Sequence, residues 1–329
     1  MTECRTELAG SGSRGPAGAA LGSTMPLYFF QQCVIWAVNC FARLRFLFTI
    51  ALSALLASSC SHSSHLLERN VTYTPAGWPQ ALAADIYAPQ DAAQAAGLRP
   101  AVLLVHGGGW ENRGRSDMDG VAERLAGRGF VVMNVAYRFA PSYRFPAPLH
   151  DLQHAMRWLR AYAAKYAVDP ERIGAFGYSA GGHLAALLGT VSDGDALDQP
   201  YGGRETRVQA VVAGGAPLDL RKFTGGRLVP QFLGATLAEN PALFATASPL
   251  VHVTREDAPM FLYHGGWDDL VDRSHSEDMK RALDQAGVHA ELRIVPLLGH
   301  VATFLLARGT EAEAIEFLAI ALRSSGAPR

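Results

Sequence analysis

Residues 177–181 read Gly-Tyr-Ser-Ala-Gly, which places a serine between two glycines. The apolar run 172–176 before it predicts a buried strand, and residues 183–188 after it predict a helix. A strand, a G-x-S-x-G turn and a helix form the context that exposes a serine hydroxyl on a tight turn as a nucleophile. The neighbours must be small because this turn strains the serine backbone. We therefore predict Ser179 as a nucleophile, the alternative being an incidental serine in a glycine-rich turn.

A second glycine-rich turn, residues 106–110, reads His-Gly-Gly-Gly-Trp and follows the apolar run 102–105. A loop of this type after a buried strand supplies backbone N–H groups to the negative oxygen of a tetrahedral intermediate. Glycines allow a substrate to approach the backbone closely. A phosphate-binding loop is the alternative, but neither G-x-G-x-x-G nor a Walker lysine follows.

A serine hydroxyl is a weak nucleophile at neutral pH, so it needs a general base that a carboxylate holds in place. His300 stands after the last apolar run, residues 291–295, on a loop that leads into a final helix, which is where the base belongs. His289 precedes that run, and His252 and His275 lie in unrelated segments. We expect His106 and His183 to hold loops by hydrogen bonds.

The carboxylate is expected in the segment 264–272, which follows the apolar run 260–263. An acid here would lie at the carboxyl edge of the sheet, beside the serine. The pattern H-G-x-x-D-x-x-V resembles the acid loop of α/β-hydrolases, and this resemblance favours Asp268. Asp269 and Asp272 are alternatives that fit surface or helix-capping roles, and Asp219 is a more distant rival.

These segments need a scaffold, and from about residue 70 apolar runs alternate with helical patterns. The predicted strands are residues 71–74, 81–87, 102–105, 130–135, 172–176, 208–213, 260–263 and 291–295. The predicted helices are residues 118–128, 148–166, 273–286 and 302–324, with one more after Ser179. This alternation predicts an α/β fold with a mostly parallel sheet that helices cover on both faces.

The stretch from residue 220 to residue 248 is longer than a normal connection between two strands. It contains Gly225 and Gly226 together with scattered apolar residues. We interpret it as a short inserted lid, with a plain long crossover as the alternative.

The chain has 329 residues and a formal net charge of −1. This length fits one large α/β domain plus a tail, and a near-neutral chain lacks the basic surface that binds nucleic acid. No group of His, Cys and Asp has the spacing of a metal site, so we expect neither a metal nor another cofactor.

The amino-terminal part carries the features of an export signal. Residues 1–24 are rich in Gly, Ala and Ser, and they cannot bury a core. Arg43 and Arg45 precede the apolar run 46–56, which is too short for a comfortable transmembrane helix. We predict that residues 1–59 are removed on export, with an uncleaved anchor as the alternative. Because the arginines lie far from Met1, we also expect that translation starts later, for example at Met25.

Residues 55–60 resemble the lipobox of bacterial lipoproteins, which implies cleavage before Cys60 and lipid attachment to its thiol. Ala57 departs from the leucine that is usual at its position. No cysteine follows Cys60, so a mature chain that starts there forms no internal disulfide. Residues 60–69 would then tether a catalytic domain over residues 70–329. The expected location is the cell envelope, as a lipoprotein or as a periplasmic or secreted protein.

Taken together, these segments resemble the hormone-sensitive-lipase-like branch of the α/β-hydrolases, and within it the bacterial acetyl-xylan and feruloyl esterases. The resemblance covers about residues 70–321 and rests on several motifs in order. They are residues 106–110, 136–138, 145–147, 168–173 and 177–183, and the loops bearing Asp268 and His300.

The resemblance implies an α/β-hydrolase fold in which Ser179 is the nucleophile and Asp268 and His300 are its partners. It also implies oxyanion donors, which are the N–H groups of Gly108, Gly109 and Ala180. We expect three aromatic residues to line the substrate pocket: Trp110, Tyr178 and Trp267. Tyr178 stands where relatives often carry Ser or Asp, which predicts a different pocket floor.

The resulting expectation is a serine carboxylesterase that hydrolyses short-chain acyl esters, with acetylated or feruloylated carbohydrates as candidate substrates. Arylformamidases share the fold and a similar histidine-glycine loop, so hydrolysis of an N-formyl amide is the alternative. A peptidase of this fold usually carries a large extra domain, and a binding protein would be expected to lose a triad residue. The expected partners are a small-molecule ester and, through the lipid, a membrane.

Overall fold

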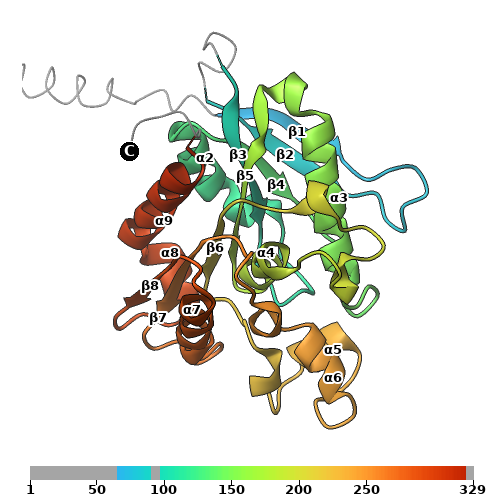
Figure 1. The fold of residues 1–329 in the computed structure, drawn as a ribbon, viewed down its shortest axis with the longest axis vertical. Helices are drawn as coiled ribbons and strands as arrows, with labels where there is room; N and C mark the ends of the chain where they lie inside the picture. Colours follow the sequence, from blue (N-terminus) through green and yellow to red (C-terminus); the bar gives the residue numbers. More distant parts are fainter. Residues whose placement is uncertain (1–64, 90–96, 324–329) are drawn as a thin grey trace, which may run out of the picture. The chain divides into compact units, whose positions relative to one another are not determined.

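The computed structural model describes residues 65–89 and 97–323, whose centre is one eight-stranded sheet (Figure 1). Its strands are β1 (Leu66–Thr72), β2 (Ala83–Tyr87), β3 (Arg99–Val105), β4 (Val131–Val135), β5 (Val168–Tyr178), β6 (Val211–Gly214), β7 (Met260–Gly265) and β8 (Ala290–Val295). Their order is β1-β2-β4-β3-β5-β6-β7-β8. Strand β2 is antiparallel to β1 and β4, and all other pairs are parallel. The predicted mostly parallel sheet is confirmed.

Helices cover both faces of this sheet, and two short helices lie outside these layers. The helices of the described residues are α2 (Asp119–Gly127), α3 (Ala147–Ala161), α4 (Ala180–Thr190), α5 (Leu228–Leu233), α6 (Pro241–Thr246), α7 (Ser274–Ala286), α8 (His300–Leu306) and α9 (Arg308–Ala321). The two short helices outside the layers are α5 and α6. Figure 1 shows α2 and α9 on one side of the sheet and α3 and α4 on the other. Strand β3 shows why both sides are apolar, because Leu103 packs with one layer and Leu104 with the other.

Two boundaries differ from the sequence prediction. Strand β1 begins at Leu66, so residues 66–69 belong to the sheet and not to the predicted tether, and the domain begins before residue 70. The predicted helix 302–324 is in fact two helices, α8 and α9, which meet at Ala307. Ala307 has a non-helical ψ of 48° and is buried, so the chain turns there and lays α9 against the sheet.

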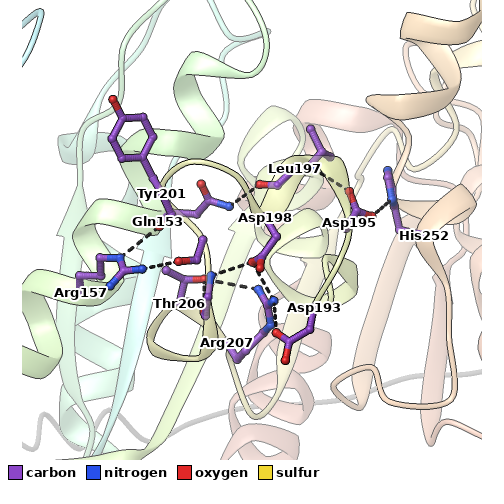
Figure 2. A network of polar contacts seen from close by, with 12 residues as sticks. Gln153, Arg157, Asp193, Asp195, Leu197, Asp198, Tyr201, Thr206, Arg207 and His252 are labelled. Carbon is purple, nitrogen blue, oxygen red and sulfur yellow. Dashed lines mark hydrogen bonds and ion pairs between the residues drawn. The ribbon is translucent and has the colours of Figure 1, made fainter.

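The connection from α4 to β6 is held by polar contacts on several sides (Figure 2). The Asp198 carboxylate accepts a hydrogen bond of 2.7 Å from Arg207 within the connection. Gln153 of α3 donates to a carbonyl of this connection at 2.8 Å. The ring of His252 lies 2.5 Å from the carboxylate of Asp195. These contacts anchor the carboxyl end of α4, whose amino end follows Ser179.

The predicted lid lies between β6 and β7 and contains α5 and α6, which Figure 1 shows outside the two helical layers. It is therefore a small insertion, and it contains two short helices that the sequence pattern did not predict. Within residues 65–89 and 97–323, no helix is both long and apolar enough to cross a bilayer. The predicted signal segment and Cys60 lie outside the described residues.

Candidate active site

Ser179 stands at the turn between β5 and α4 with a φ of 56° and a ψ of −125°. A positive φ is costly for a residue with a side chain, and it is found where surrounding structure enforces it. A Cβ added at Gly177 would lie 2.2 Å from the carbonyl oxygen of Gly181, and one at Gly181 would lie 2.2 Å from that of Val105. Only glycines fit at both positions, which accounts for the G-x-S-x-G pattern.

The structure brings Ser179, His300 and Asp268 together in one hydrogen-bonded row. The Ser179 Oγ lies 2.9 Å from Nε2 of His300, and the Nδ1 of His300 lies 2.7 Å from Oδ2 of Asp268. The three residues follow β5, β8 and β7, so they meet where these parallel strands end. A histidine held between a hydroxyl and a carboxylate can accept the hydroxyl proton.

Asp268 is buried, and its carboxylate has donors on both oxygens. Oδ1 accepts the N–H groups of Leu270 at 3.1 Å and Val271 at 2.9 Å. Burial by itself raises the pKa of Asp268, but hydrogen bonds from His264 and His300 outweigh it and hold the pKa well below its usual value. The carboxylate therefore stays ionised beside His300.

The rival carboxylates have other surroundings. Asp269 is exposed. Asp272 accepts the N–H of Ser274 at the start of α7, at 2.9 Å. Asp219 pairs with Arg221 at 2.7 Å. Within the described residues, none of these three carboxylates contacts His300, so Asp268 is the carboxylate that the structure aligns with the histidine.

The sequence analysis did not assign a role to His264, which is fully buried. Its Nε2 lies 2.8 Å from the carbonyl of Val271 and 3.3 Å from Oδ2 of Asp268, while its Nδ1 lies 2.8 Å from the hydroxyl of Ser276. Because Nε2 faces two acceptors, it carries the proton, and Nδ1 accepts from Ser276. The sequence did contain a hint of the contact between His264 and Asp268, because His264 is the first residue of the pattern H-G-x-x-D, four positions before Asp268.

The predicted oxyanion donors lie beside the serine. Gly108 and Gly109 have φ angles of 105° and 61°, and Ala180 is the first residue of α4. Within the described part of the chain, the N–H groups of these three residues have no protein acceptor. Unpaired N–H groups at a helix start and in a glycine loop can receive a developing negative charge.

Two histidines hold the surrounding loops. The Nδ1 of His106 lies 2.7 Å from the carbonyl of Gly107, and burial lowers the pKa of His106 to about 4. Burial likewise lowers the pKa of His183 to about 4. His183 accepts a hydrogen bond of 3.2 Å from the indole N–H of Trp110, and its Nε2 lies 2.7 Å from the carbonyl of Ala247. Both imidazole rings are therefore neutral and hold the surrounding loops by hydrogen bonds, which is the role that their position in the sequence suggested.

Two cavities open at Ser179. The smaller, of about 290 Å³, is lined by Ala180, Trp110 and residues of the insertion. The larger, of about 470 Å³, is lined by Tyr178, His300 and the oxyanion loop. Leu228 of α5 and Leu270 line both cavities, as do Gly109 and Ser179, so the two cavities share a boundary at these residues.

The three aromatic residues predicted for the pocket have different positions. Trp110 lines the smaller cavity and stacks on Phe232 of α5 with ring centroids 4.4 Å apart. Tyr178 lines the larger cavity, and its hydroxyl donates to the carbonyl of His300 at 2.6 Å. The prediction for Trp267 is wrong, because its side chain is 68% exposed and lines neither cavity. The neighbouring Asp268 turns inward to His300, which leaves Trp267 on the outer side of the loop.

An ion pair that sequence reasoning missed joins the oxyanion loop to the insertion. The guanidinium of Arg227 meets both carboxylate oxygens of Glu111, at 2.5 and 2.6 Å. Gln231 of α5 adds a third bond to the same carboxylate at 2.5 Å. This bidentate contact holds Leu228, the next residue, at the boundary between the cavities. Among residues 65–89 and 97–323, no group of three His, Cys, Asp or Glu side chains could hold a metal.

Comparison with known proteins finds esterases that are similar to this chain. Esterase LipQ of Mycobacterium tuberculosis is 32% identical over 226 residues, which are 66% of this chain and 53% of that protein. The chain spans about half the length of three mycobacterial relatives, LipQ, LipC and LipM.

Two solved structures resemble most of the described chain. An acetyl ester-xyloside bifunctional hydrolase from Caldicellulosiruptor lactoaceticus is 25% identical with a TM-score of 0.67, over 80% of this chain and 100% of that one. A thermophilic esterase from the Planctomycetes species Thermogutta terrifontis, solved with butyrate bound, is 27% identical with a TM-score of 0.66, over 82% of this chain and 98% of that one. Both likenesses confirm the α/β-hydrolase fold.

The family model for BD-FAE matches residues 84–283. The match runs from β2 to α7, so it includes Ser179, the oxyanion loop and Asp268. Because it spans more than half of the sequence, the chain belongs to the BD-FAE family.

Proposed function

We propose that this protein is a serine carboxylesterase that hydrolyses esters of short-chain acids. The observation that carries the proposal is the row of hydrogen bonds from Ser179 through His300 to Asp268, next to unpaired backbone N–H groups. Such a row activates a hydroxyl, and such N–H groups stabilise the negative charge that its attack creates. The names of the relatives, which are esterases, support the same activity.

In the proposed reaction, His300 Nε2 takes the proton from Ser179 as its oxygen attacks the ester carbonyl carbon. The carbonyl oxygen becomes negative and is held by the N–H groups of Gly108, Gly109 and Ala180. The intermediate then expels the alcohol oxygen, which receives the proton from His300, and leaves an acyl-serine. Water attacks this acyl group by the same route and releases the acid. Losing one oxyanion donor typically lowers turnover about 10²–10³-fold.

The size of the smaller cavity indicates that the preferred substrates have short acyl groups. The insertion lines this cavity with Phe223, Gly225 and Leu228. It is too short to form a large lipase-like lid. The butyrate that was found bound to the Thermogutta terrifontis esterase is a short acid of this kind. We therefore propose acetyl to butyryl esters as preferred substrates.

A substrate panel tests the proposal. Purified protein is assayed with p-nitrophenyl esters from acetate to palmitate, with N-formylkynurenine and with an acetylated xyloside. We expect kcat/KM to be highest between acetate and butyrate and to fall for longer acids. Hydrolysis of N-formylkynurenine with no ester hydrolysis would instead support the arylformamidase alternative. The names of LipQ and of the two solved structures do not favour that alternative. A rate that keeps climbing to palmitate would contradict the short-chain preference.

For the segment outside the described residues, we propose export and lipid attachment at Cys60. The support is Arg43 and Arg45 before the apolar run 46–56, and the absence of any later cysteine. Several acyl chains on one cysteine would hold the enzyme firmly, since each buried CH₂ contributes about 0.8 kcal/mol. Metabolic labelling with a fatty acid should mark the wild type and the Cys40→Ala control but not Cys60→Ala. An unlabelled mature protein that begins elsewhere would contradict the anchor and leave the esterase proposal untouched.

A further inference from the structure

Exposed apolar side chains gather in the part of the chain that carries Asp268 and His300. Of the twelve large apolar or aromatic side chains that are exposed in the described residues, six lie within residues 267–306. They are Trp267, Leu270, Leu297, Val301, Leu305 and Leu306. Single exposed apolar residues are ordinary on a protein surface, whereas a group of them marks a place where something apolar binds.

Three of the six line the larger cavity at Ser179, and we call Leu270, Val301 and Leu305 the apolar rim. Their side chains are 52%, 65% and 52% exposed. Val301 and Leu305 are four residues apart on α8, so they point to the same side of that helix. The half-buried Phe304 lines the same cavity, and its ring centroid lies 5.0 Å from that of Tyr178, the residue before Ser179. The rim is therefore continuous with the site of the reaction.

The position of His300 decides which part of an ester this cavity receives. His300 lines the larger cavity and does not line the smaller one. In the proposed reaction His300 returns its proton to the leaving alcohol oxygen, so the alcohol group must lie on the His300 side. The smaller cavity, which borders Ala180 and the insertion, is then left for the acyl group.

The larger cavity is also lined by Glu111, Asn112, Arg113 and Asp117, and the two carboxylates among them already have partners. Glu111 is held by Arg227 and Gln231. Asp117 accepts a hydrogen bond of 3.3 Å from a backbone N–H and lies 3.9 Å from Arg113. Hydroxyl groups of a sugar would have to compete with these contacts, whereas an alkyl or aryl group would only cover apolar surface.

We infer that the larger cavity binds an apolar alcohol group of the ester, alkyl or aryl, which the apolar rim buries during the reaction. This inference rests on the proposed esterase function. It predicts that the alcohol part of the substrate contributes to kcat/KM through its apolar area, and that sugar esters with the same acyl group are poorer substrates.

The test keeps the acyl group constant and varies the alcohol. The kcat/KM values of methyl butyrate, hexyl butyrate and a butyrylated methyl xyloside are measured for wild type and three variants by acid release at constant pH. Leu305→Ser removes apolar area from the rim, and Leu305→Met keeps it. Ile320→Ser is the matched control, because Ile320 on α9 is 56% exposed and lines neither cavity. Thermal unfolding and size-exclusion chromatography accompany each variant.

In wild type, we expect hexyl butyrate to exceed both methyl butyrate and the xyloside by about tenfold in kcat/KM. Leu305→Ser should lower the hexyl-to-methyl ratio about fivefold, whereas Leu305→Met and Ile320→Ser keep the wild-type ratio. Equal values for hexyl and methyl butyrate, or a preference for the xyloside, would overturn this inference and leave the esterase proposal standing. If Leu305→Ser changes the oligomeric mass but leaves the hexyl-to-methyl ratio unchanged, the apolar rim is a contact between subunits and the inference is overturned. Absence of hydrolysis of every ester would overturn both proposals.

Discussion

The Nε2 atom of His264 lies 3.3 Å from Oδ2 of Asp268, the same oxygen that meets Nδ1 of His300 at 2.7 Å. Two histidines therefore contact the same carboxylate oxygen. Hydrogen bonds to an ionised group are stronger than neutral ones, and they fix its orientation as well as its charge. His264 thus acts as a positioning residue for Asp268, and it does so from the end of strand β7 without touching Ser179.

Replacement of His264 tests this role. His264→Ala removes a charge-assisted hydrogen bond worth about 1.5–3 kcal/mol, so we expect kcat to fall roughly tenfold or more. KM should change little, because His264 lines neither cavity. His264→Gln retains a donor and should recover part of the lost kcat. A rise in KM with kcat unchanged, measured on p-nitrophenyl butyrate, would contradict a positioning role.

Neighbouring carboxylates in the same loop provide a matched pair. Asp268→Asn removes the charge that orients His300, and the expected loss in kcat is about 10⁴-fold. Asp269→Asn alters an exposed side chain and should keep kcat within about twofold of wild type. The two variants are compared on the same ester after their folding has been checked by circular dichroism. A reversed order of severity would mean that Asp269 is the orienting carboxylate.

Gly225 offers a way to shrink the smaller cavity. It lines that cavity, and a Cβ added there would meet no atom within 4 Å. Gly225→Val should therefore fold and reduce the space for the acyl group, so that kcat/KM for butyrate falls about tenfold relative to acetate. Gly114→Val is the control, since Gly114 also has free space and lines neither cavity. An unchanged butyrate-to-acetate ratio would place the acyl group elsewhere.

The buried histidines predict how stability depends on pH. Burial lowers the pKa of His106 to about 4, whereas an unfolded histidine titrates near 6.5. Between pH 4 and pH 6.5 the unfolded chain binds more protons at this histidine than the folded chain does. The free energy of unfolding is therefore at its full value with respect to this group above pH 6.5, and it decreases as the pH falls towards 4. We expect the unfolding temperature to decline over that range.

A substitution at His106 separates its contribution from the others. His106→Asn can still donate to the carbonyl of Gly107 but cannot titrate, so its unfolding temperature should decline less steeply between pH 6.5 and 4. His289→Asn, on an exposed side chain, should keep the wild-type dependence. Parallel curves for His106→Asn and wild type would contradict the neutral, buried state of His106.

Much of the site could be predicted because its residues follow strands. Ser179, Asp268 and His300 each come three to five positions after an apolar run, and parallel strands bring their carboxyl ends to one edge of the sheet. The glycines at 177 and 181 mark the turn because no other residue fits there. These signals are local, so the sequence alone carries them.

Other features depend on which way a side chain turns or on contacts between distant segments. Trp267 adjoins Asp268 in the sequence, yet it points outward because its neighbour points inward. The Glu111–Arg227 pair joins residues that are 116 positions apart, and no spacing rule links them. The break at Ala307 has no proline to mark it and follows from packing of α9 on the sheet.

The central claim is that Ser179 is the nucleophile of an esterase. Its most direct test is the kcat of purified Ser179→Ala on p-nitrophenyl butyrate, beside wild type prepared in the same way. The structure predicts a folded variant with the wild-type unfolding temperature within a few degrees and a kcat reduced by about four orders of magnitude or more. A folded Ser179→Ala protein that retains about a tenth of the wild-type kcat would contradict the claim and require another nucleophile.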